Sequence, residues 1–355
     1  MIVGACGFGS SGSSVISDYL SEYGERVQVI DNIEFTWVSN VDGLIDLEYH
    51  IMHPHGRTSD SIYAIRRFLS LTTRCEREYE EIGKMEKGVL RKSAQKFIEQ
   101  ITDLTWDWYD FEKHETERKY RYLKYRIDDH LMWTTIPRRE KKLGMQIKQY
   151  PMETVYFSVA PTNFYTAAQA HIKELLSAMG AKKDKIIVLD QPFSGNNPQS
   201  AFPFYEDPYA IVVDRDPRDN YVFARTKLLG RNHFMPCSDV QSFIKYYRRL
   251  RDNQPYKDKH DRILAVQFED LVYDYENATK RVRDFLGLGE NPAPRSVFDP
   301  SMSINNTQVW KRYPQFAEDI RIIEQELGDY LFDFSKYGEQ EITGEMFFGK
   351  SPLHK

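Results

Sequence analysis

Short apolar runs and stretches with helical spacing alternate along the chain. The first apolar run, residues 2–6, has the length of a buried strand, and a loop rich in glycine and serine follows it. After the loop, apolar residues recur over 15–20 at the spacing of one helix face, and Gly24 is a stop signal. The pattern therefore predicts a strand, a loop and a helix at the start of the chain.

The same alternation recurs further along. Apolar runs predict further strands over 27–31, 155–159, 186–191, 209–214 and 263–268. Helical spacing and cap residues predict helices from Asn163 to Gly180, from Pro217, from Ser238, and over 275–286 and 314–331. Strands that alternate with helices indicate an α/β fold with a doubly wound, mostly parallel sheet.

Residues 72–150 differ in character, because charges of both signs alternate there while helical spacing continues. Three of the five tryptophans lie in this stretch: Trp106, Trp108 and Trp133. We interpret it as a helical insertion whose aromatic residues form its own core, a lid over a ligand, or both, since aromatic rings beside Arg and Lys suit sugars and anionic polymers. We assign the rest of residues 1–340 to a single α/β domain and residues 341–355 to a C-terminal tail.

The loop over residues 7–14 has the composition of a phosphate cradle. Glycines let the backbone approach an anion, loop N–H groups point inward, and the next helix adds partial positive charge. The spacing Gly7-x4-Gly12 is that of a Walker A loop, but Ser13 stands where its lysine belongs, which disfavours ATP or GTP hydrolysis. A turn that binds nothing is also disfavoured, because three glycines between a strand and a helix would weaken the fold.

A second group of cations, Arg215, Arg218, Arg225 and Lys227, gathers where the strand over 209–214 meets the next helix. A hydrogen bond to a charged group contributes about 1.5–3 kcal/mol, whereas a helix dipole alone contributes about 0.3–1 kcal/mol. If these arginines face the crevice at the carboxyl ends of the strands, they should dominate the affinity. A loop and a separate arginine cluster together indicate a ligand with two phosphate groups.

Titratable groups are dense near position 50, among them Glu48, His50, His53 and His55. The histidines fall at i, i+3 and i+5 with a proline between them, which is not a one-face helix spacing. A metal site is therefore disfavoured. A single side chain acting as a general base, or ordinary polar loop residues, are the other interpretations.

Composition narrows the class of protein. The 355 residues are 41% hydrophobic and 28% charged, as in an ordinary globular protein. No apolar run approaches the roughly 20 residues of a membrane helix, so we expect no stable membrane insertion, and the N-terminus lacks the basic region of a secretory signal. A net charge of −5 argues against a nucleic-acid binder that works by overall basicity and leaves a local basic site open. Three widely spaced cysteines, Cys6, Cys75 and Cys237, indicate a reducing, cytoplasmic setting.

Four segments in order resemble the PAPS-dependent sulfotransferase family. They are residues 7–14, 214–221 (Asp-Arg-Asp-Pro-Arg-Asp-Asn-Tyr), 267–288 and 305–312 (Asn-Asn-Thr-Gln-Val-Trp-Lys-Arg). In that family the first loop holds the 5′-phosphosulfate, the arginine after the strand holds the 3′-phosphate, and the last segment closes over the nucleotide. The resemblance covers residues 1–35 and about 186–335. The runs Asp46-Leu-Glu48, Arg66-Arg67 and Asp190-Gln191 are most like bacterial members that act on polysaccharides.

The resemblance implies PAPS as the sulfate donor and PAP as the product, with no metal. It assigns the nucleotide to Gly9, Ser10, Ser11, Gly12, Ser13, Ser14, Arg215, Arg225, Trp310, Lys311 and Arg312. The candidates for the general base are, in order, Glu34, Glu48 and His53. Glu34 leads because it follows a strand end beside the loop.

Two positions depart from the family pattern. Ser10 stands where the family has Lys or Arg, and Phe223 stands where it has Ser. Either another cation replaces the missing one, or the chain binds the nucleotide without turning it over well. The predicted function is a cytoplasmic sulfotransferase that moves sulfate from PAPS to a carbohydrate hydroxyl. The alternatives are a non-catalytic nucleotide-binding protein of the same fold and a P-loop kinase, which Ser13 disfavours.

Overall fold

A five-stranded parallel sheet forms the centre of the molecule, with the strand order β2-β5-β1-β6-β7. The computed structural model describes residues 1–53, 56–57, 59–81, 83–108, 153–228, 235–255, 260–338, 342 and 344–346. The strands of this sheet are β1 (Ile2–Gly7), β2 (Val27–Glu34), β5 (Ile186–Asp190), β6 (Pro208–Asp214) and β7 (Ile263–Gln267). Because β1 is the middle strand, the loop that follows it lies at the centre of the carboxyl edge of the sheet.

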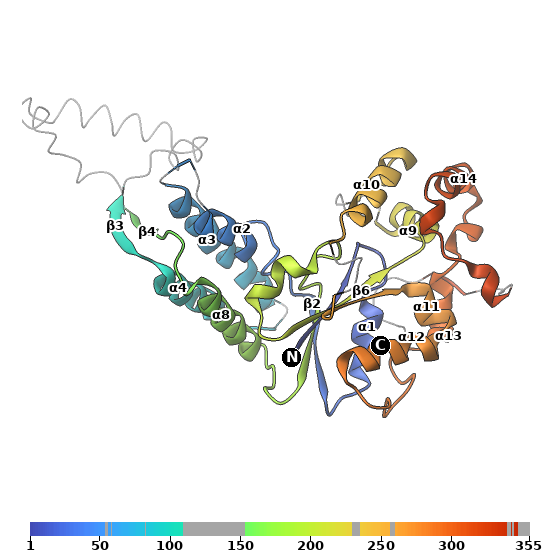
Figure 1. Ribbon diagram of the computed structural model, residues 1–355, viewed down its shortest axis with the longest axis horizontal. Helices are drawn as coiled ribbons and strands as arrows, with labels where there is room; N and C mark the ends of the chain where they lie inside the picture. The colour runs from blue at the N-terminus through green and yellow to red at the C-terminus, as the bar shows by residue number, and fades with distance from the viewer. Residues whose placement is uncertain are drawn as a thin grey trace, which may run out of the picture.

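Helices cover both faces of this sheet (Figure 1). One face packs against α1 (Ser14–Ser21), α11 (Phe268–Tyr273) and α12 (Tyr275–Leu286), and the other against α2 (Leu44–Met52), α3 (Asp60–Glu81), α4 (Val89–Ile101) and α8 (Phe164–Ala178). Successive strand residues point to opposite faces, so Val188 packs in the first group while Ile187 and Leu189 pack in the second. A sheet buried on both faces needs strands that are apolar throughout. The predicted α/β fold with a doubly wound, mostly parallel sheet is confirmed.

A third apolar cluster lies beyond the carboxyl end of β6. Its helices are α9 (Pro217–Phe223) with its π-helical continuation (Ala224–Leu228), α10 (Val240–Asp252) and α14 (Ala317–Glu326). Pro217 is the first residue of α9, as predicted, and the Asp216 side chain caps that helix by accepting a hydrogen bond from the Arg218 N–H at 2.9 Å. The first turn of α9 is thereby fixed directly beyond the end of β6.

Short helices fill the connections. They are η1 (Pro198–Phe204), α13 (Pro300–Ser303), η3 (Ile304–Asn306), η4 (Val309–Arg312), η5 (Pro314–Phe316), η6 (Gly328–Tyr330) and η7 (Phe334–Tyr337). The single helix predicted over 314–331 is therefore wrong, since regular α-helix covers only Ala317–Glu326 between two 3-10 turns. The predicted cap Ser238 is wrong by one residue, because the Asp239 side chain accepts from the Ser242 N–H at 2.8 Å.

The strand predicted over 155–159 does not join the central sheet. It is β4 (Glu153–Phe157), which pairs antiparallel with β3 (Leu104–Trp108) in a separate two-stranded sheet. The sequence pattern placed 104–108 in a helical insertion, but its large apolar residues alternate with Thr105 and Asp107 at the period of a strand. Residues 109–150, Trp133 included, lie outside the described residues. The division into domain, insertion and tail stays a prediction.

Candidate active site

The loop over residues 7–14 joins β1 to α1 in a tightly held conformation. Gly9, Ser10 and Gly12 have φ values of 78°, 54° and 84°, in the left-handed region that favours glycine. A Cβ atom at Gly12 would lie 2.7 Å from the Phe268 ring, so this position has no room for a side chain. The Phe8 N–H donates to Ser11 Oγ at 3.2 Å. These contacts fix the loop before any ligand binds.

Arg215 links this loop to the end of β6. Strands β1 and β6 are paired, with Gly7 opposite Val213, so the residue that follows β6 lies beside the loop. The Arg215 side chain donates from Nη1 to the Ser10 carbonyl at 3.1 Å and from Nη2 to the Asn306 carbonyl. The residue is only 3% exposed. The two anion sites that the sequence predicted are therefore in direct contact.

Both elements line one cleft of about 290 Å³ at the carboxyl edge of the sheet. Its lining residues are Ser10, Gly12, Ser13, Ser14, Val15, Asp18, Glu34, Asp190, Gln191, Arg215, Phe223, Phe268, Phe298, Ser303 and Asn306. Among the described lining residues, Arg215 is the only cation and Asp18, Glu34 and Asp190 are the carboxylates. The Phe223 and Phe268 ring centroids each lie 5.2 Å from Arg215 Cζ, so both rings flank the guanidinium.

The carboxylates meet where β2 and β5 end. Glu34 pairs with Asp190 across these strands, and the Phe35 N–H donates to the Asp190 carbonyl at 2.7 Å. Burial, then the charges of Glu34 and Asp18, raise the pKa of Asp190 to about 7. Gln191 Nε2 donates to Ser13 Oγ at 2.7 Å, which ties this strand end to the glycine loop. The cleft thus contains a group that titrates near neutral pH.

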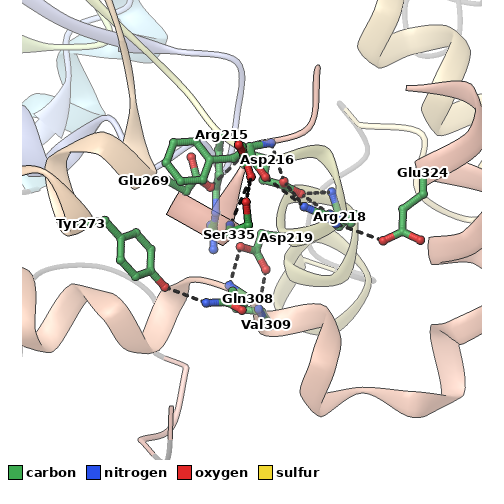
Figure 2. Close-up of polar contacts among 12 residues, drawn as sticks. Arg215, Asp216, Arg218, Asp219, Glu269, Tyr273, Gln308, Val309, Glu324 and Ser335 are labelled. Atoms are coloured by element: carbon green, nitrogen blue, oxygen red, sulfur yellow. Dashed lines mark hydrogen bonds and ion pairs between the residues drawn. The ribbon is translucent and has the colours of Figure 1, made fainter. Parts of the chain in front are cut away.

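Behind Arg215, a buried polar network attaches residues 304–309 to α9 (Figure 2). Asp219 accepts hydrogen bonds from the backbone N–H groups of Gln308 and Val309, at 2.8 and 2.5 Å. Glu269 accepts one from the Asp216 N–H at 3.0 Å. Burial raises the pKa of Asp219 and of Glu269, and the Arg215 charge opposes that rise in both. The network holds the Asn306 carbonyl where Arg215 can reach it.

Six of the predicted nucleotide residues do not line the cleft: Gly9 and Ser11 of the loop, and four residues further along the chain. Trp310 packs on Arg218, whose Cζ lies 4.0 Å from a Trp310 ring centroid, and Lys311 is exposed. Arg312 donates to the carbonyls of Asn305 and Gly344. Arg225 donates to the carbonyls of Cys237 and Ser238, at 2.9 and 2.8 Å. From the segment after residue 300, Ser303 and Asn306 face the cleft instead.

Two of the three candidate bases also lie elsewhere. Glu48 on α2 accepts a hydrogen bond from the Tyr165 hydroxyl at 2.6 Å, and His53 Nε2 is 4.0 Å from Glu48 Oε1. Neither residue lines the cleft, whereas Glu34 does. His55 lies outside the described residues, and within them no group of three or more His, Cys, Asp or Glu side chains could hold a metal ion. Of the candidate bases, the structure brings only Glu34 to the loop.

Several cleft residues were not assigned from the sequence. Asp18 is on the first helix, and nothing in the sequence pattern distinguishes it from a residue that faces solvent. Asp190 and Gln191 do carry a signal, because they end a buried strand at the carboxyl edge of the sheet. Phe223, predicted only as a departure from a family serine, lies against Arg215.

Comparison with known proteins places the chain. No curated protein sequence matches it significantly. Similar solved structures include a sulfotransferase domain from the curacin biosynthetic pathway (14% identity, 94% of this chain and 98% of that chain, TM-score 0.39). Others are a sulfotransferase from Alicyclobacillus acidocaldarius (11%, 95% and 98%, 0.36) and retinol dehydratase in complex with androsterone and inactive cofactor PAP (14%, 94% and 83%, 0.32). At these identities and TM-scores the similarities carry no argument about substrates.

The family comparison is decisive. Within the described residues no helix has both the length and the apolar character needed to cross a bilayer. The family model described as "Sulfotransferase family" matches residues 6–292, which contain the glycine loop, the Arg215 turn and the carboxyl ends of all five strands of the central sheet. The chain belongs to the sulfotransferase family.

Proposed function

We propose that the chain transfers a sulfuryl group from PAPS to a hydroxyl group of a carbohydrate. The observation that carries the proposal is the contact between Arg215 and the Ser10 carbonyl inside one cleft. This contact supports joint binding of one doubly phosphorylated nucleotide by the glycine loop and the buried guanidinium. A sulfuryl transfer needs in-line positioning, a base for the acceptor and hydrogen-bond donors for the leaving oxygens.

The residues present fit an anionic nucleotide. Arg215 Nε is buried and has no hydrogen-bond partner among the described residues, as expected where a ligand supplies the missing acceptor. The loop N–H groups and the hydroxyls of Ser13 and Ser14 would hold the 5′-phosphosulfate, and Arg215 would hold the 3′-phosphate. Bound there, PAPS supplies an activated sulfuryl group. Ser10 offers no charge, so backbone donors carry more of the binding than in relatives with a loop cation.

The acceptor side of the proposal rests on Glu34. Its carboxylate lies at the end of β2 in the same cleft, where it can accept the proton of an approaching hydroxyl. A carbohydrate acceptor is supported by the bacterial polysaccharide-type features of the sequence. Cys6, Cys75 and Cys237 are unpaired and buried, which supports a cytoplasmic setting.

One observation favours a second candidate function. The cleft has one cation and several carboxylates among its described lining residues, which is an unfavourable balance for the leaving charge of PAP. A nucleotide-binding protein of this fold without turnover would tolerate that balance. The P-loop kinase remains disfavoured, because Ser13 occupies the position of the catalytic lysine.

Incubation of the purified chain with PAPS and a panel of glycans, with PAP release as the readout, tests the proposal. We expect PAP release with at least one glycan and none from the Arg215→Ala variant. Lys227 is exposed, so Lys227→Ala is the matched charge control and should keep the activity. Binding of PAP without release on any acceptor would favour the non-catalytic protein. Tighter binding of ATP·Mg²⁺ than of PAP, measured by calorimetry, would favour the kinase.

A further inference from the structure

The carboxyl groups of Glu34 and Asp190 are held next to each other by the backbone. After a register shift in β2, Glu34 is the direct partner of Asp190 on β5. The hydrogen bond from the Phe35 N–H to the Asp190 carbonyl, at 2.7 Å, closes this end of the ladder. Side chains of directly paired residues on neighbouring strands lie on the same face of a sheet. Both side chains line the cleft of the glycine loop.

Asp190 is the more buried of the two residues. Its Oδ1 atom is buried and lacks a hydrogen-bond partner within the described part of the chain. The titratable groups near it on neighbouring elements are Glu34 on β2, Asp18 on α1 and the buried Cys6 thiol on β1. Burial first, then Glu34 and Asp18, raise the pKa of Asp190 to about 7. The negative charge of Glu34 therefore works against ionisation of Asp190.

We propose that Glu34 and Asp190 form one proton-sharing pair that takes the proton of the acceptor hydroxyl; this inference rests on the function proposed above. The pair is ready for transfer when both carboxyl groups are ionised. When the acceptor oxygen bonds to sulfur, its proton passes to the pair. The bond from sulfur to the phosphate oxygen breaks, and its electron pair stays on the phosphate. The proton then leaves the pair for solvent before the next transfer.

The pair explains what Glu34 alone does not. A single exposed glutamate is ionised well below neutral pH and is a weak base, whereas two adjacent carboxylates that are both ionised take up their first proton at a higher pH. The proton that the pair takes up also removes one negative charge from the cleft while negative charge develops on the leaving phosphate. That matters because Arg215 is the only cation among the described lining residues.

Carboxyl-carbon NMR of the unliganded chain with labelled aspartate tests whether the pair exists. Asp190→Asn assigns the signal of Asp190. We expect this signal to titrate near neutral pH in the wild type, and its midpoint to fall toward the ordinary aspartate range in Glu34→Gln. Asp184→Asn, on the exposed turn before β5, is the control and should leave the titration unchanged. An identical midpoint in wild type and Glu34→Gln would overturn the pair.

Kinetics with PAPS and the glycan that releases most PAP test the role of the pair. We expect Asp190→Asn and Glu34→Gln each to lower kcat at least about 100-fold, the scale of a lost general base. The double variant should lose little more than either single variant, because the two residues act as one unit. Full kcat in Asp190→Asn would overturn the role. If the wild type releases no PAP with any glycan, the proposed function fails, and the NMR titration still decides whether the pair exists.

Discussion

The Arg215 guanidinium donates a hydrogen bond to the Ser10 carbonyl across 3.1 Å and so joins the end of β6 to the loop after β1. The same side chain donates to the Asn306 carbonyl, which the Asp219 network holds in place. A buried charge without partners would be costly, and these carbonyls together with the flanking rings of Phe223 and Phe268 offset that cost. Arg215 therefore organises three separate segments around one cleft.

Replacement of Arg215 by alanine should weaken PAP binding. The loss of a charged hydrogen-bond donor from a buried position predicts at least about a tenfold higher Kd, which corresponds to about 1.4 kcal/mol. Isothermal titration calorimetry with PAP measures it, and circular dichroism shows whether the variant is folded. Lys227→Ala should bind PAP like the wild type, because Lys227 is exposed and does not line the cleft. Unchanged affinity in a folded Arg215→Ala variant would place the 3′-phosphate elsewhere.

A second prediction concerns Gly195, which packs against the end of β1. A Cβ atom there would lie 2.4 Å from the Gly7 carbonyl oxygen and 2.7 Å from its carbon, and neither backbone atom can move without disturbing the glycine loop. Gly195→Ala should lower the free energy of unfolding by about 1–3 kcal/mol, the usual cost of overpacking. Urea unfolding measures this change. Gly289→Ala, where nothing lies within 4 Å of the added carbon, is the matched control. Equal stability of the two variants would contradict the packing argument.

A feature of the fold or of the site could be predicted from the sequence where its pattern is local in the chain. The glycine loop and the Arg215 turn carry local patterns, a strand followed by a characteristic loop, and parallel strand ends meet at one edge of a sheet. Their contact was therefore predictable. The positions of Trp310 and Arg312 were not predictable. They depend on the Asp219 network, which attaches this segment to α9, and on the packing of the Trp310 ring against Arg218.

The base candidates show the same limit. Glu34 follows a strand of the central sheet and so lies at the cleft. Glu48 and His53 belong to a helix of the flanking layer, and no local pattern says which side of that layer they face. The strand over 104–108 was missed for another reason. Its partner strand lies some fifty residues later, and charged helical sequence surrounds it.

The raised pKa of Asp190 predicts how stability depends on pH. The folded protein holds this proton up to about pH 7, whereas an aspartate in the unfolded chain has an ordinary pKa of 3.8. Between these values the folded state binds more protons, so the free energy of unfolding falls as the pH rises. Asp190→Asn should match the wild type near pH 4 and exceed its stability at pH 8. Urea unfolding at both pH values measures the difference. The same difference in unfolding free energy between Asp190→Asn and the wild type at both pH values would contradict the prediction.

The Ser10→Lys substitution adds the cation that the loop lacks. Ser10 lines the cleft, and its φ of 54° already belongs to a residue with a Cβ atom, so a lysine there adds no new backbone strain. A positive charge beside Arg215 offsets part of the charge of the cleft carboxylates and gives a new charge-assisted donor to the nucleotide. Ser10→Lys should therefore bind PAP about tenfold more tightly than the wild type, since one such hydrogen bond contributes about 1.5–3 kcal/mol. Calorimetry with PAP at low and high salt measures the gain, which should shrink as salt screens the charge. Ser10→Met, of similar length but without charge, is the control and should show no gain. A Ser10→Lys variant that binds PAP no better than Ser10→Met would mean that the phosphosulfate does not lie against this loop.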